Sequence, residues 1–366
     1  MMKKGMICVF VMLLSVSCSS NQQPHLSEEQ SGVKREVQDK ENDDHLSSDS
    51  DPEIVTDNLN VPWSIAKTQD TFYITERPGS IVEITDGEQV RQTVELENEV
   101  ATAAEAGLLG FVLDPNFSNS HLAYAYYTYE ENESQYNRVI TLRLQDNVWT
   151  EEEVLVDQLP SGAYHHGGRL KMGPDGKLYA TTGDATDENI AQDKSSLGGK
   201  ILRMNVDGTI PKDNPLSDSY VYSYGHRNPQ GLTWIDEKLY ASEHGNAAND
   251  EINHIQPGNN YGWPIIEGDE EQEGMISPLF TSGNDVTWAP SGMDAYENNL
   301  YVAGLRGEAI FQFTPETGDE QKWLSGFGRI RDVFIENDQL YFITNNRDGR
   351  GSPDENDDVL YQLSLN

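Results

Sequence analysis

Short runs in which apolar and polar residues alternate recur from about residue 54 to the C-terminus. In one repeated pattern, an apolar residue precedes a tyrosine, and a few alternating residues lead to a turn that contains Gly, Asn or Arg. Such alternation predicts a β-strand, because a period of two places apolar side chains on one face of a sheet. The six copies are Phe72-Tyr73-Ile74-Thr75, Leu122-Ala123-Tyr124-Ala125-Tyr126, Leu178-Tyr179-Ala180-Thr181, Leu239-Tyr240-Ala241-Ser242, Leu300-Tyr301-Val302-Ala303 and Leu340-Tyr341-Phe342-Ile343.

The spacing of these copies predicts the fold. Steps between the tyrosines are 51, 55, 61, 61 and 40 residues, which is the length of a four-stranded sheet with its loops. Helices are not expected, since no stretch of a dozen residues keeps a 3.6-residue period without Gly or Pro. We predict an all-β chain, a six-bladed β-propeller with a disordered N-terminal tether. A pair of β-sandwiches is the alternative, but it would not explain the near-equal spacing.

The first residues have the layout of a secretory signal peptide, with two lysines, an apolar run over 6–16 and then small residues. The run is shorter than the roughly 20 residues of a membrane-spanning helix, so a retained anchor is the weaker interpretation. Cys18 lies just after the run, as at a bacterial lipoprotein cleavage site, although Ser15 stands where a leucine is usual. We predict a signal peptide over 1–17 and a lipid on Cys18.

Residues 18–53 are rich in Ser, Gln, Asp and Glu, with almost no large apolar side chains. Such a segment cannot bury enough surface to offset the entropy of ordering. We predict a lipid-anchored, disordered acidic tether here, and a catalytic propeller domain over 54–366 on the outer side of a membrane. The chain's two cysteines, Cys8 and Cys18, precede that domain, so its core must hold it together without disulfides.

A formal net charge of −37 argues against nucleic acid as a partner. Chemistry in a propeller belongs to loops at one mouth of the central channel. Adjacent histidines followed by two glycines suit a base on a loop that a ligand approaches closely, although ordinary surface histidines also explain them. The candidate clusters are Tyr164-His165-His166-Gly167-Gly168-Arg169, Gly183-Asp184, Gly225-His226-Arg227-Asn228-Pro229-Gln230-Gly231, and Glu243-His244-Gly245-Asn246 followed by Asp250-Glu251-Ile252-Asn253.

Two kinds of ligand site follow from these clusters. Five of the eight histidines fall between residues 165 and 254, but no zinc-type spacing and no cysteine ligand accompanies them. Calcium, which takes carboxylate and carbonyl oxygens, fits an exported acidic protein better. Four arginines, Arg227, Arg306, Arg329 and Arg331, lie in glycine-flanked segments. Salt bridges would explain any one of them, whereas four together suggest a cationic floor for a polyanionic ligand.

In their order along the chain, the motifs resemble the glucose/sorbosone dehydrogenase family, and within it the PQQ-dependent soluble aldose sugar dehydrogenases. The resemblance runs from about Asn58 to the C-terminus. It is carried by the clusters above together with Val61-Pro62-Trp63, Thr75-Glu76-Arg77-Pro78-Gly79, Gly107-Leu108-Leu109-Gly110, Asp114-Pro115-Asn116-Phe117, Gly198-Gly199-Lys200-Ile201-Leu202-Arg203, Asn260-Tyr261-Gly262-Trp263-Pro264, Ala289-Pro290-Ser291-Gly292 and Arg329-Ile330-Arg331-Asp332-Val333.

The resemblance implies a six-bladed propeller that binds pyrroloquinoline quinone (PQQ) and Ca²⁺ and oxidises an aldose at C1 to its lactone. It implies that His165 takes the proton of the C1 hydroxyl while hydride passes to C5 of PQQ, and that Asp184 orients the imidazole. Arg227 belongs to the same catalytic set. Cofactor contacts are implied for Arg227, Asn228, Thr287, Arg306, Arg329 and Arg331, calcium contacts for the carbonyls of Gly245 and Asn246, and a substrate contact for Glu105.

Three positions depart from the family's pattern. Asn246 replaces a common proline, Glu105 replaces the usual glutamine, and Arg306 stands where some relatives have lysine. Two other functions remain open, a calcium-dependent lactonase and a non-catalytic sugar- or ligand-binding propeller. The arginines argue against the first, and the presence of His165 and Asp184 argues against the second. We expect a monomer that acts on an aldose and passes electrons to an acceptor that the sequence does not identify.

Overall fold

The computed structural model describes residues 51–366. The predicted signal peptide, Cys18 and the predicted tether up to residue 50 lie outside the described residues. The first strand begins at Glu53, the last residue of that predicted tether. Helix is confined to two single turns of the described chain, and neither is long and apolar enough to cross a membrane. These turns are α1 (Phe117–Ser120) and η1 (Glu188–Ala191).

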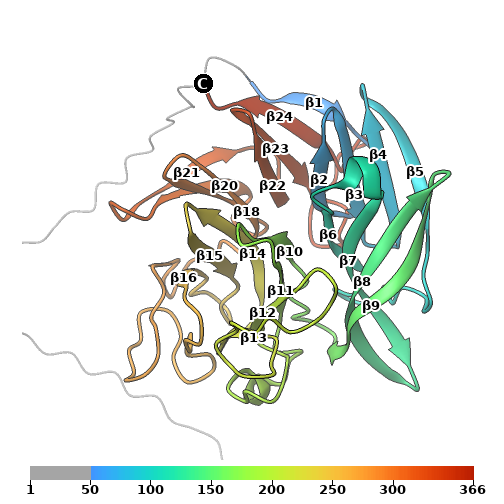
Figure 1. The fold of residues 1–366 in the computed structure, drawn as a ribbon. Helices are drawn as coiled ribbons and strands as arrows, with labels where there is room; N and C mark the ends of the chain where they lie inside the picture. The colour runs from blue at the N-terminus through green and yellow to red at the C-terminus, as the bar shows by residue number, and fades with distance from the viewer. Residues whose placement is uncertain (1–50) are drawn as a thin grey trace, which may run out of the picture. The chain divides into compact units, whose positions relative to one another are not determined.

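Hydrogen bonds join the strands of residues 51–366 into one eight-stranded sheet and four four-stranded sheets (Figure 1). The eight-stranded sheet contains, in spatial order, β2 (Pro62–Thr68), β3 (Thr71–Glu76), β4 (Ser80–Thr85), β5 (Glu88–Glu95), β9 (Val148–Pro160), β8 (Ser134–Gln145), β7 (Leu122–Glu131) and β6 (Leu108–Leu113). The four-stranded sheets contain β10 (Leu170–Met172), β11 (Leu178–Thr182), β12 (Lys200–Met204) and β13 (Val221–Tyr224); β14 (Pro229–Ile235), β15 (Lys238–Glu243), β16 (Glu251–Ile255) and β17 (Phe280–Thr281); β18 (Pro290–Tyr296), β19 (Asn299–Gly304), β20 (Ala309–Thr314) and β21 (Asp319–Ser325); and β1 (Glu53–Thr56), β24 (Leu360–Ser364), β23 (Gln339–Thr344) and β22 (Ile330–Glu336).

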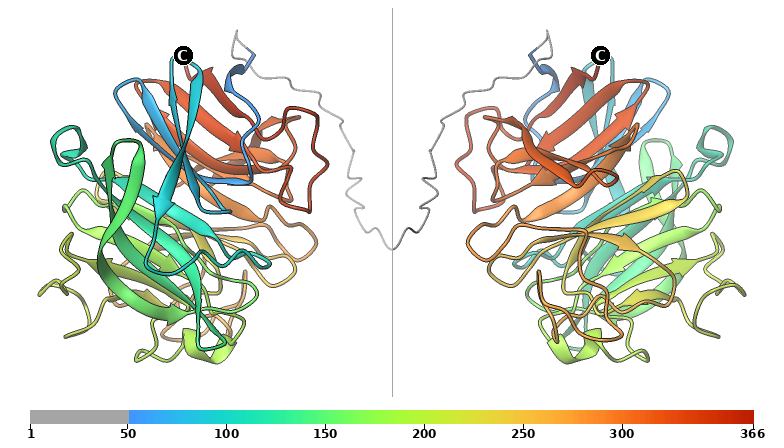
Figure 2. Two further views of the ribbon diagram at one scale, coloured as in Figure 1. Left: turned by 90° about the vertical axis from the view of Figure 1, so that its right-hand side faces the viewer. Right: turned by 90° about the vertical axis from the view of Figure 1, so that its left-hand side faces the viewer.

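Six strands form a ring at the centre of the molecule. In the order β2, β6, β10, β14, β18 and β22, each contacts the next, and β22 contacts β2. The sheets extend outward from this ring, twisted and packed face to face (Figures 1 and 2). The last sheet closes through β1, which pairs antiparallel with β24. The prediction of an all-β, propeller-like chain is therefore confirmed.

The repeated tyrosines occupy equivalent places in this arrangement. Each lies on the strand that follows a ring strand, namely β3, β7, β11, β15, β19 or β23. In the eight-stranded sheet, the first four strands and the last four meet where β5 pairs parallel with β9, at Thr93 and Val148. All other paired strands that are named here run antiparallel. The sequence repeat thus marks one unit of chain per ring strand.

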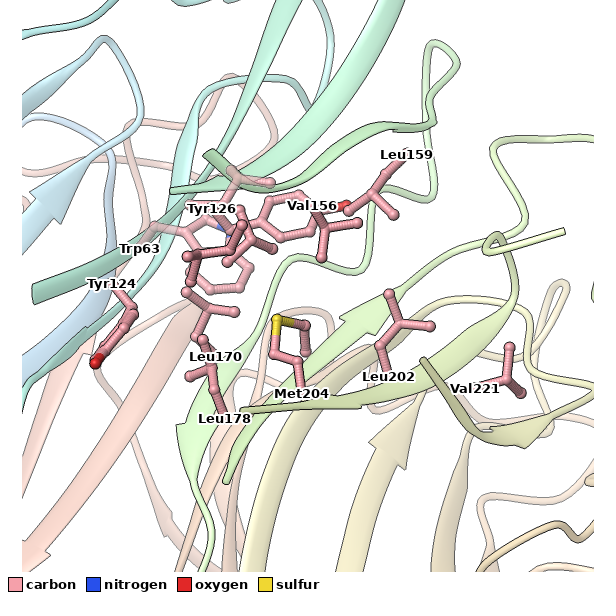
Figure 3. Close-up of a cluster of buried hydrophobic side chains, with 14 residues drawn as sticks. Trp63, Tyr124, Tyr126, Val156, Leu159, Leu170, Leu178, Leu202, Met204 and Val221 are labelled. Carbon is pink, nitrogen blue, oxygen red and sulfur yellow. The ribbon is translucent and has the colours of Figure 1, made fainter. Parts of the chain in front are cut away.

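Apolar side chains fill the spaces between neighbouring sheets. One cluster brings together Trp63 of β2, Tyr126 of β7, Leu170 of β10 and Leu202 of β12, each no more than 2 % exposed (Figure 3). Full burial of one such side chain contributes about 1.5–3 kcal/mol. Because these clusters fix the sheets against one another, the loops at the ends of the ring strands have a rigid base.

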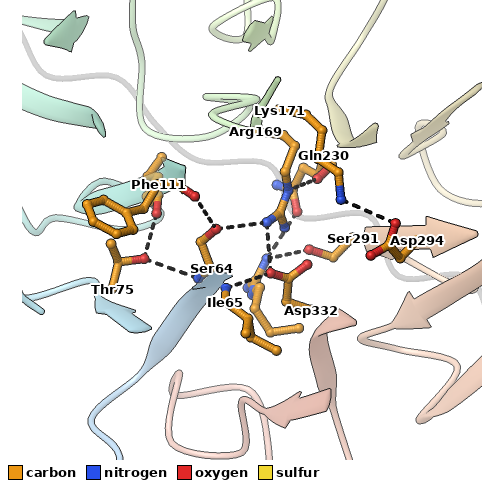
Figure 4. Close-up of polar contacts among 12 residues, drawn as sticks. Ser64, Ile65, Thr75, Phe111, Arg169, Lys171, Gln230, Ser291, Asp294 and Asp332 are labelled. Carbon is orange, nitrogen blue, oxygen red and sulfur yellow. Dashed lines mark hydrogen bonds and ion pairs between the residues drawn. The ribbon is translucent and has the colours of Figure 1, made fainter. Parts of the chain in front are cut away.

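A buried polar layer lies across the ring, centred on Arg169 and Asp332 (Figure 4). Arg169 Nη1 lies 3.0 Å from Asp332 Oδ2, and its Nε donates to the Gln230 carbonyl at 2.8 Å. Asp332 also accepts the Ile65 N–H at 2.9 Å. On one side, Arg169 and Asp332 line a largely apolar cavity of about 190 Å³.

Candidate active site

A cavity of about 200 Å³ lies among loops that lead into ring strands and loops that follow the second strands. Nine of the eleven site residues predicted for the described chain line it. The full lining is Glu105, His165, Arg227, Asn228, His244, Gly245, Asn246, Ala247, Asp250, Thr287, Ala289, Leu305, Arg306, Arg329 and Arg350. Of the other two, Asp184 bonds to His165, and Arg331 lines an adjoining cavity of about 50 Å³ that shares Glu105, His244, Leu305 and Arg350 with the first.

His165 and Asp184 form a hydrogen-bonded pair. His165 Nδ1 lies 2.7 Å from Asp184 Oδ1, and the two side chains are 18 % and 3 % exposed. A carboxylate at Nδ1 favours the tautomer in which that nitrogen carries the proton, which leaves Nε2 free to accept one. Gly183 allows the loops to approach, because a Cβ there would lie 1.9 Å from the His165 carbonyl oxygen. The Gly183-Asp184 motif therefore sets the imidazole against its carboxylate.

Trp263 holds Asp184 from the other side. Its indole Nε1 donates to Asp184 Oδ2 at 2.9 Å, and the Thr186 N–H donates to Oδ1 at 2.8 Å. The Arg227 guanidinium lies over the Trp263 ring, 5.2 Å from its centroid, a distance that suits a cation–π contact. In the sequence, Trp263 stands out only as part of the motif over 260–264. The motif alone does not reveal that its indole positions Asp184, the carboxylate that is bonded to His165.

His166 faces away from this pair, although it is the next residue. Its Nδ1 lies 3.2 Å from Ser161 Oγ and 3.1 Å from Asn137 Oδ1, and the side chain is buried. Burial lowers the pKa of His166 to about 4, because the charged imidazolium loses its hydration. His166 is therefore neutral near pH 7 and lines the smaller cavity.

Arg227 and Asn228 precede β14 and have different surroundings. Asn228 Oδ1 accepts the Gly167 N–H at 3.0 Å, which ties its loop to the His165 loop. The Arg227 N–H donates to Glu243, and its Nη1 lies 3.4 Å from the His244 carbonyl oxygen. Arg227 Nε is buried and has no hydrogen-bond partner among the described residues. Burial lowers the pKa of Arg227, and the charges of Asp184 and Glu243 oppose that change.

The late arginines differ in how their charge is balanced. Arg329 pairs with Asp348, with Nη2 2.8 Å from Oδ2. Arg331 is buried and its hydrogen bonds go to neutral side chains; its Nη1 donates to Gln230 Oε1 at 3.0 Å. Its Nε has no partner within residues 51–366, and burial lowers its pKa to about 9. Arg306 is exposed at the cavity wall.

Asp250 organises the wall that carries the predicted calcium ligands. Its Oδ1 accepts the Gly245 N–H at 3.0 Å, and its Oδ2 accepts the Thr287 hydroxyl at 2.8 Å. The Asn246 N–H donates to Glu267 Oε1 at 2.6 Å. No cluster of three or more His, Cys, Asp or Glu side chains that could hold a metal occurs in residues 51–366. Calcium binding here would therefore depend on carbonyl oxygens, as the resemblance implies.

Glu105 lies at the cavity wall, but its two oxygens already have partners. Oε1 lies 2.8 Å from Arg350 Nη1, and Oε2 accepts the His165 N–H at 3.2 Å. Burial opposes ionisation of Glu105, yet the hydrogen bond and charge of Arg350 outweigh it and lower the pKa to about 2. Arg350 is a wall residue that sequence analysis missed, because it lies in a Gly-rich loop without a recognised motif.

Comparison with known proteins places the chain in a family. The model of the family described as Glucose / Sorbosone dehydrogenase matches residues 59–359. Quinoprotein glucose dehydrogenase B of Acinetobacter calcoaceticus is 35% identical over 292 residues, 70% of this chain and 60% of that longer protein. Aldose sugar dehydrogenase YliI of Escherichia coli is 32% identical over 336 residues, 81% of this chain and 90% of that protein.

A solved structure agrees with these sequence relatives. The PQQ-bound form of aldose sugar dehydrogenase from Streptomyces coelicolor is 36% identical and superposes with a TM-score of 0.80, over 85% of this chain and 96% of that chain. The family suggested by the ordered motifs is therefore confirmed, and this chain belongs to the glucose/sorbosone dehydrogenase family.

Proposed function

We propose that this protein is a PQQ- and calcium-dependent enzyme that oxidises aldose sugars at C1 to lactones. One observation carries the proposal: a single cavity brings the His165–Asp184 pair together with Arg227, Arg306 and Arg329. A base fixed by a carboxylate suits removal of a hydroxyl proton, and guanidinium groups suit a ligand with several carboxylates. The names of the relatives support the same cofactor and substrate class.

The residues present fit PQQ, which carries three carboxylates and an ortho-quinone. The guanidinium groups of Arg227 and Arg306 have no carboxylate within 4 Å in the described chain, and the buried Arg227 Nε has no partner. Unpaired buried donors are costly unless a ligand or water satisfies them. Arg227, Asn228, Thr287, Arg306 and Arg329 would contact the cofactor from the main cavity, and Arg331 from the adjoining one. When bound, PQQ supplies the quinone that takes up the hydride from sugar C1.

The protein's own part in the reaction is the movement of one proton. His165 Nε2 accepts the proton of the C1 hydroxyl as the C1–H bond gives up its hydride, so that C1 and its oxygen form the lactone carbonyl. Asp184 keeps the proton of Nδ1 in place and stabilises the imidazolium that results. Trp263 fixes Asp184, so the base does not need to reorganise during the step.

Calcium has a smaller set of groups to bind it. Gly245 and Asn246 line the cavity, and both of their N–H groups donate to carboxylates. No hydrogen bond within residues 51–366 ends on either carbonyl oxygen. Carbonyl oxygens are ligands that Ca²⁺ accepts, and the ion would supply a positive charge beside the quinone oxygens.

The proposal includes architecture and location. The closed ring of six strands suggests six blades, two of which are joined edge to edge through β5 and β9. Residues 54–366 would form the catalytic propeller, preceded by a signal peptide over 1–17 and a tether over 18–53 that is attached to a membrane through lipid on Cys18. The enzyme would then work outside the cytoplasm as a monomer.

Reconstitution tests the proposal directly. Apoprotein is mixed with PQQ and Ca²⁺, and dye reduction is recorded with a panel of aldoses, with samples lacking PQQ or sugar as controls. We expect sugar-dependent dye reduction that requires both PQQ and Ca²⁺, and a lactone product. Tight PQQ binding without dye reduction by any aldose would contradict the proposed reaction, and activity that survives thorough removal of Ca²⁺ would contradict the calcium requirement.

A further inference from the structure

Glu105 links His165 to a loop that comes from the far end of the chain. Glu105 precedes β6, His165 precedes β10, and Arg350 follows β23. The carboxylate of Glu105 binds the His165 N–H with one oxygen and Arg350 Nη1 with the other. A second hydrogen bond joins the Glu105 loop to the His165 loop, since the Glu105 N–H donates to the Ala163 carbonyl at 3.4 Å.

The hydrogen bond from the His165 N–H to Glu105 is made at a strained point of the backbone. His165 has a φ of 64°, in the left-handed region that costs energy for a residue with a side chain. Such a conformation persists only where its surroundings hold it. Two neighbours do so here: Glu105 Oε2 accepts the His165 N–H, and the Ala185 N–H donates to the His165 carbonyl at 3.3 Å.

Arg350 belongs to a series of hydrogen bonds and ion pairs. Asp348 Oδ1 accepts the Arg350 N–H at 2.9 Å, and Asp348 Oδ2 pairs with Arg329. The Arg350 guanidinium also lies 5.9 Å from the centroid of the Tyr164 ring. Contacts therefore run without a gap from Arg329, on the cofactor side of the cavity, to the backbone of His165.

We infer that Glu105 and Arg350 are a positioning pair that sets the backbone of His165, and that Asp184 sets its ring. The inference rests on the proposed function, in which His165 is the base. It gives Glu105 a different role from the substrate contact implied by the family's glutamine. A glutamine has a single acceptor oxygen, so it cannot receive Arg350 and the His165 N–H on separate oxygens.

Stability does not account for this pair. The Arg350 side chain is 49 % exposed and that of Glu105 23 %, and ion pairs of this exposure contribute little to folding. Positioning of His165 explains the pair better, since a small displacement of a catalytic group can lower the reaction rate strongly. The carboxylate stays ionised in spite of its burial, because the hydrogen bond and charge of Arg350 lower its pKa to about 2.

The test compares Glu105→Gln, Arg350→Ala and Arg350→Lys, with Glu152→Gln as a matched control. Glu152 pairs with Arg143 in a comparably exposed contact, and neither residue lines the cavity or the one that adjoins it. We expect kcat to fall by roughly ten- to a hundredfold in Glu105→Gln and Arg350→Ala, with the KM for sugar and the affinity for PQQ within about twofold of wild type. Arg350→Lys should recover only part of kcat, because the lysine ammonium keeps the positive charge but lacks the planar guanidinium geometry.

A second measurement uses the apoprotein and needs no activity. Selective ¹⁵N labelling of histidine gives at most eight amide signals, and the His165 signal is assigned through a His165→Gln variant. We expect this signal to shift in Glu105→Gln and in Arg350→Ala, and to be unchanged in Glu152→Gln.

Three outcomes would overturn the inference. A raised KM with unchanged kcat would show that Glu105 contacts the sugar directly. Kinetic constants equal to those of the Glu152→Gln control would show that the pair has no role in the reaction. An unchanged His165 amide signal in Glu105→Gln would show that the contact does not hold the backbone. Failure of the wild-type enzyme to oxidise any sugar would instead contradict the proposed function, and the amide signal would still decide whether the pair positions His165.

Discussion

The arginine of the polar layer, Arg169, and two arginines of the cavity walls, Arg227 and Arg331, differ in what balances their charge. In the polar layer, Arg169 has a carboxylate 3.0 Å away in Asp332. In the cavity walls, the guanidinium groups of Arg331 and Arg227 have no carboxylate within 4 Å among the described residues, and each has a buried Nε without a partner. A buried charge that is paired can serve the fold alone, whereas a buried charge without a partner needs a ligand or water.

Residues that serve the fold and residues that face the cavity are therefore adjacent in the sequence. Arg331 and Asp332 are neighbours on β22, and successive strand residues point in opposite directions. Gln230 illustrates the same division, because its carbonyl accepts from Arg169 and its side chain accepts from Arg331. Substitutions in the polar layer should therefore lower stability, and substitutions in the cavity walls should lower activity or ligand affinity.

The largest effect is expected at His165. Replacement with Gln should lower kcat by about 10²- to 10⁴-fold, because an amide fills the volume but cannot accept the proton. Folding and PQQ binding should stay close to wild type, as judged by circular dichroism and PQQ titration. His166→Gln is the control and should retain much more activity, since His166 lines the smaller cavity and bonds to Ser161 and Asn137. Loss of activity in His166→Gln but not in His165→Gln would show that His166, and not His165, is the base.

The polar layer should respond in stability instead. Arg169→Met would leave Asp332 buried without its partner, at a cost of about 3–5 kcal/mol in the free energy of unfolding. Urea denaturation measures this cost. The double variant Arg169→Met/Asp332→Leu removes both charges and should recover a large part of the loss. If Arg169→Met unfolds like wild type but loses PQQ affinity, the division between the layer and the cavity is wrong.

Arg329 and Arg331 should affect cofactor affinity. Alanine at either position removes a charge-assisted contact worth about 1.5–3 kcal/mol, or roughly 10- to 150-fold in the Kd for PQQ. Isothermal titration calorimetry on the apoprotein measures it. Arg143→Ala is a suitable control because the pair with Glu152 is exposed, whereas Arg138, on the same strand, is buried and pairs with Asp157. Equal affinity in all three variants would show that Arg329 and Arg331 do not bind the cofactor.

The sequence predicted the fold through its repeat, and the reason is physical. A strand at a fixed place in each unit needs the same burial pattern, so Tyr73, Tyr179 and Tyr240 recur with similar burial. The parallel contact between β5 and β9 was not predicted, because an edge pairing of three residues leaves no mark on a strand's alternation. The family motifs identified the residues of the cavity, including His165 and Arg227.

The partners of those residues could not be predicted in the same way. Arg350 reaches Glu105 across 245 residues of sequence, and only the closed ring brings their loops together. Trp263 was visible as part of a motif, but its hydrogen bond to Asp184 depends on the path of a long loop after β16. The arginines were expected to act as a group, yet Arg329 is paired and Arg331 is not, which depends on the position of Asp348.

The smallest effect concerns pH and the two adjacent histidines. Burial lowers the pKa of His166 from 6.5 to about 4, with an opposing contribution from the charge of Glu105 and a further decrease from the charge of Arg77. Between these two pKa values the unfolded chain binds a proton at His166 and the folded protein does not. Stability therefore falls as pH decreases through this range, and the contribution of His166 between pH 7 and pH 5 is about 1–2 kcal/mol.

Urea denaturation of the apoprotein at pH 7 and pH 5 measures this contribution. Many groups titrate over that range, so the relevant quantity is the difference between variants. His166→Gln should lose about 1–2 kcal/mol less stability than wild type on going from pH 7 to pH 5, because the glutamine takes up no proton in either state. His121→Gln is the control, since it removes an exposed histidine at the end of α1 instead of a buried one. An identical pH dependence in wild type and His166→Gln would mean that His166 accepts a proton in the folded protein, and its assignment to the buried structural side of the site would then fail.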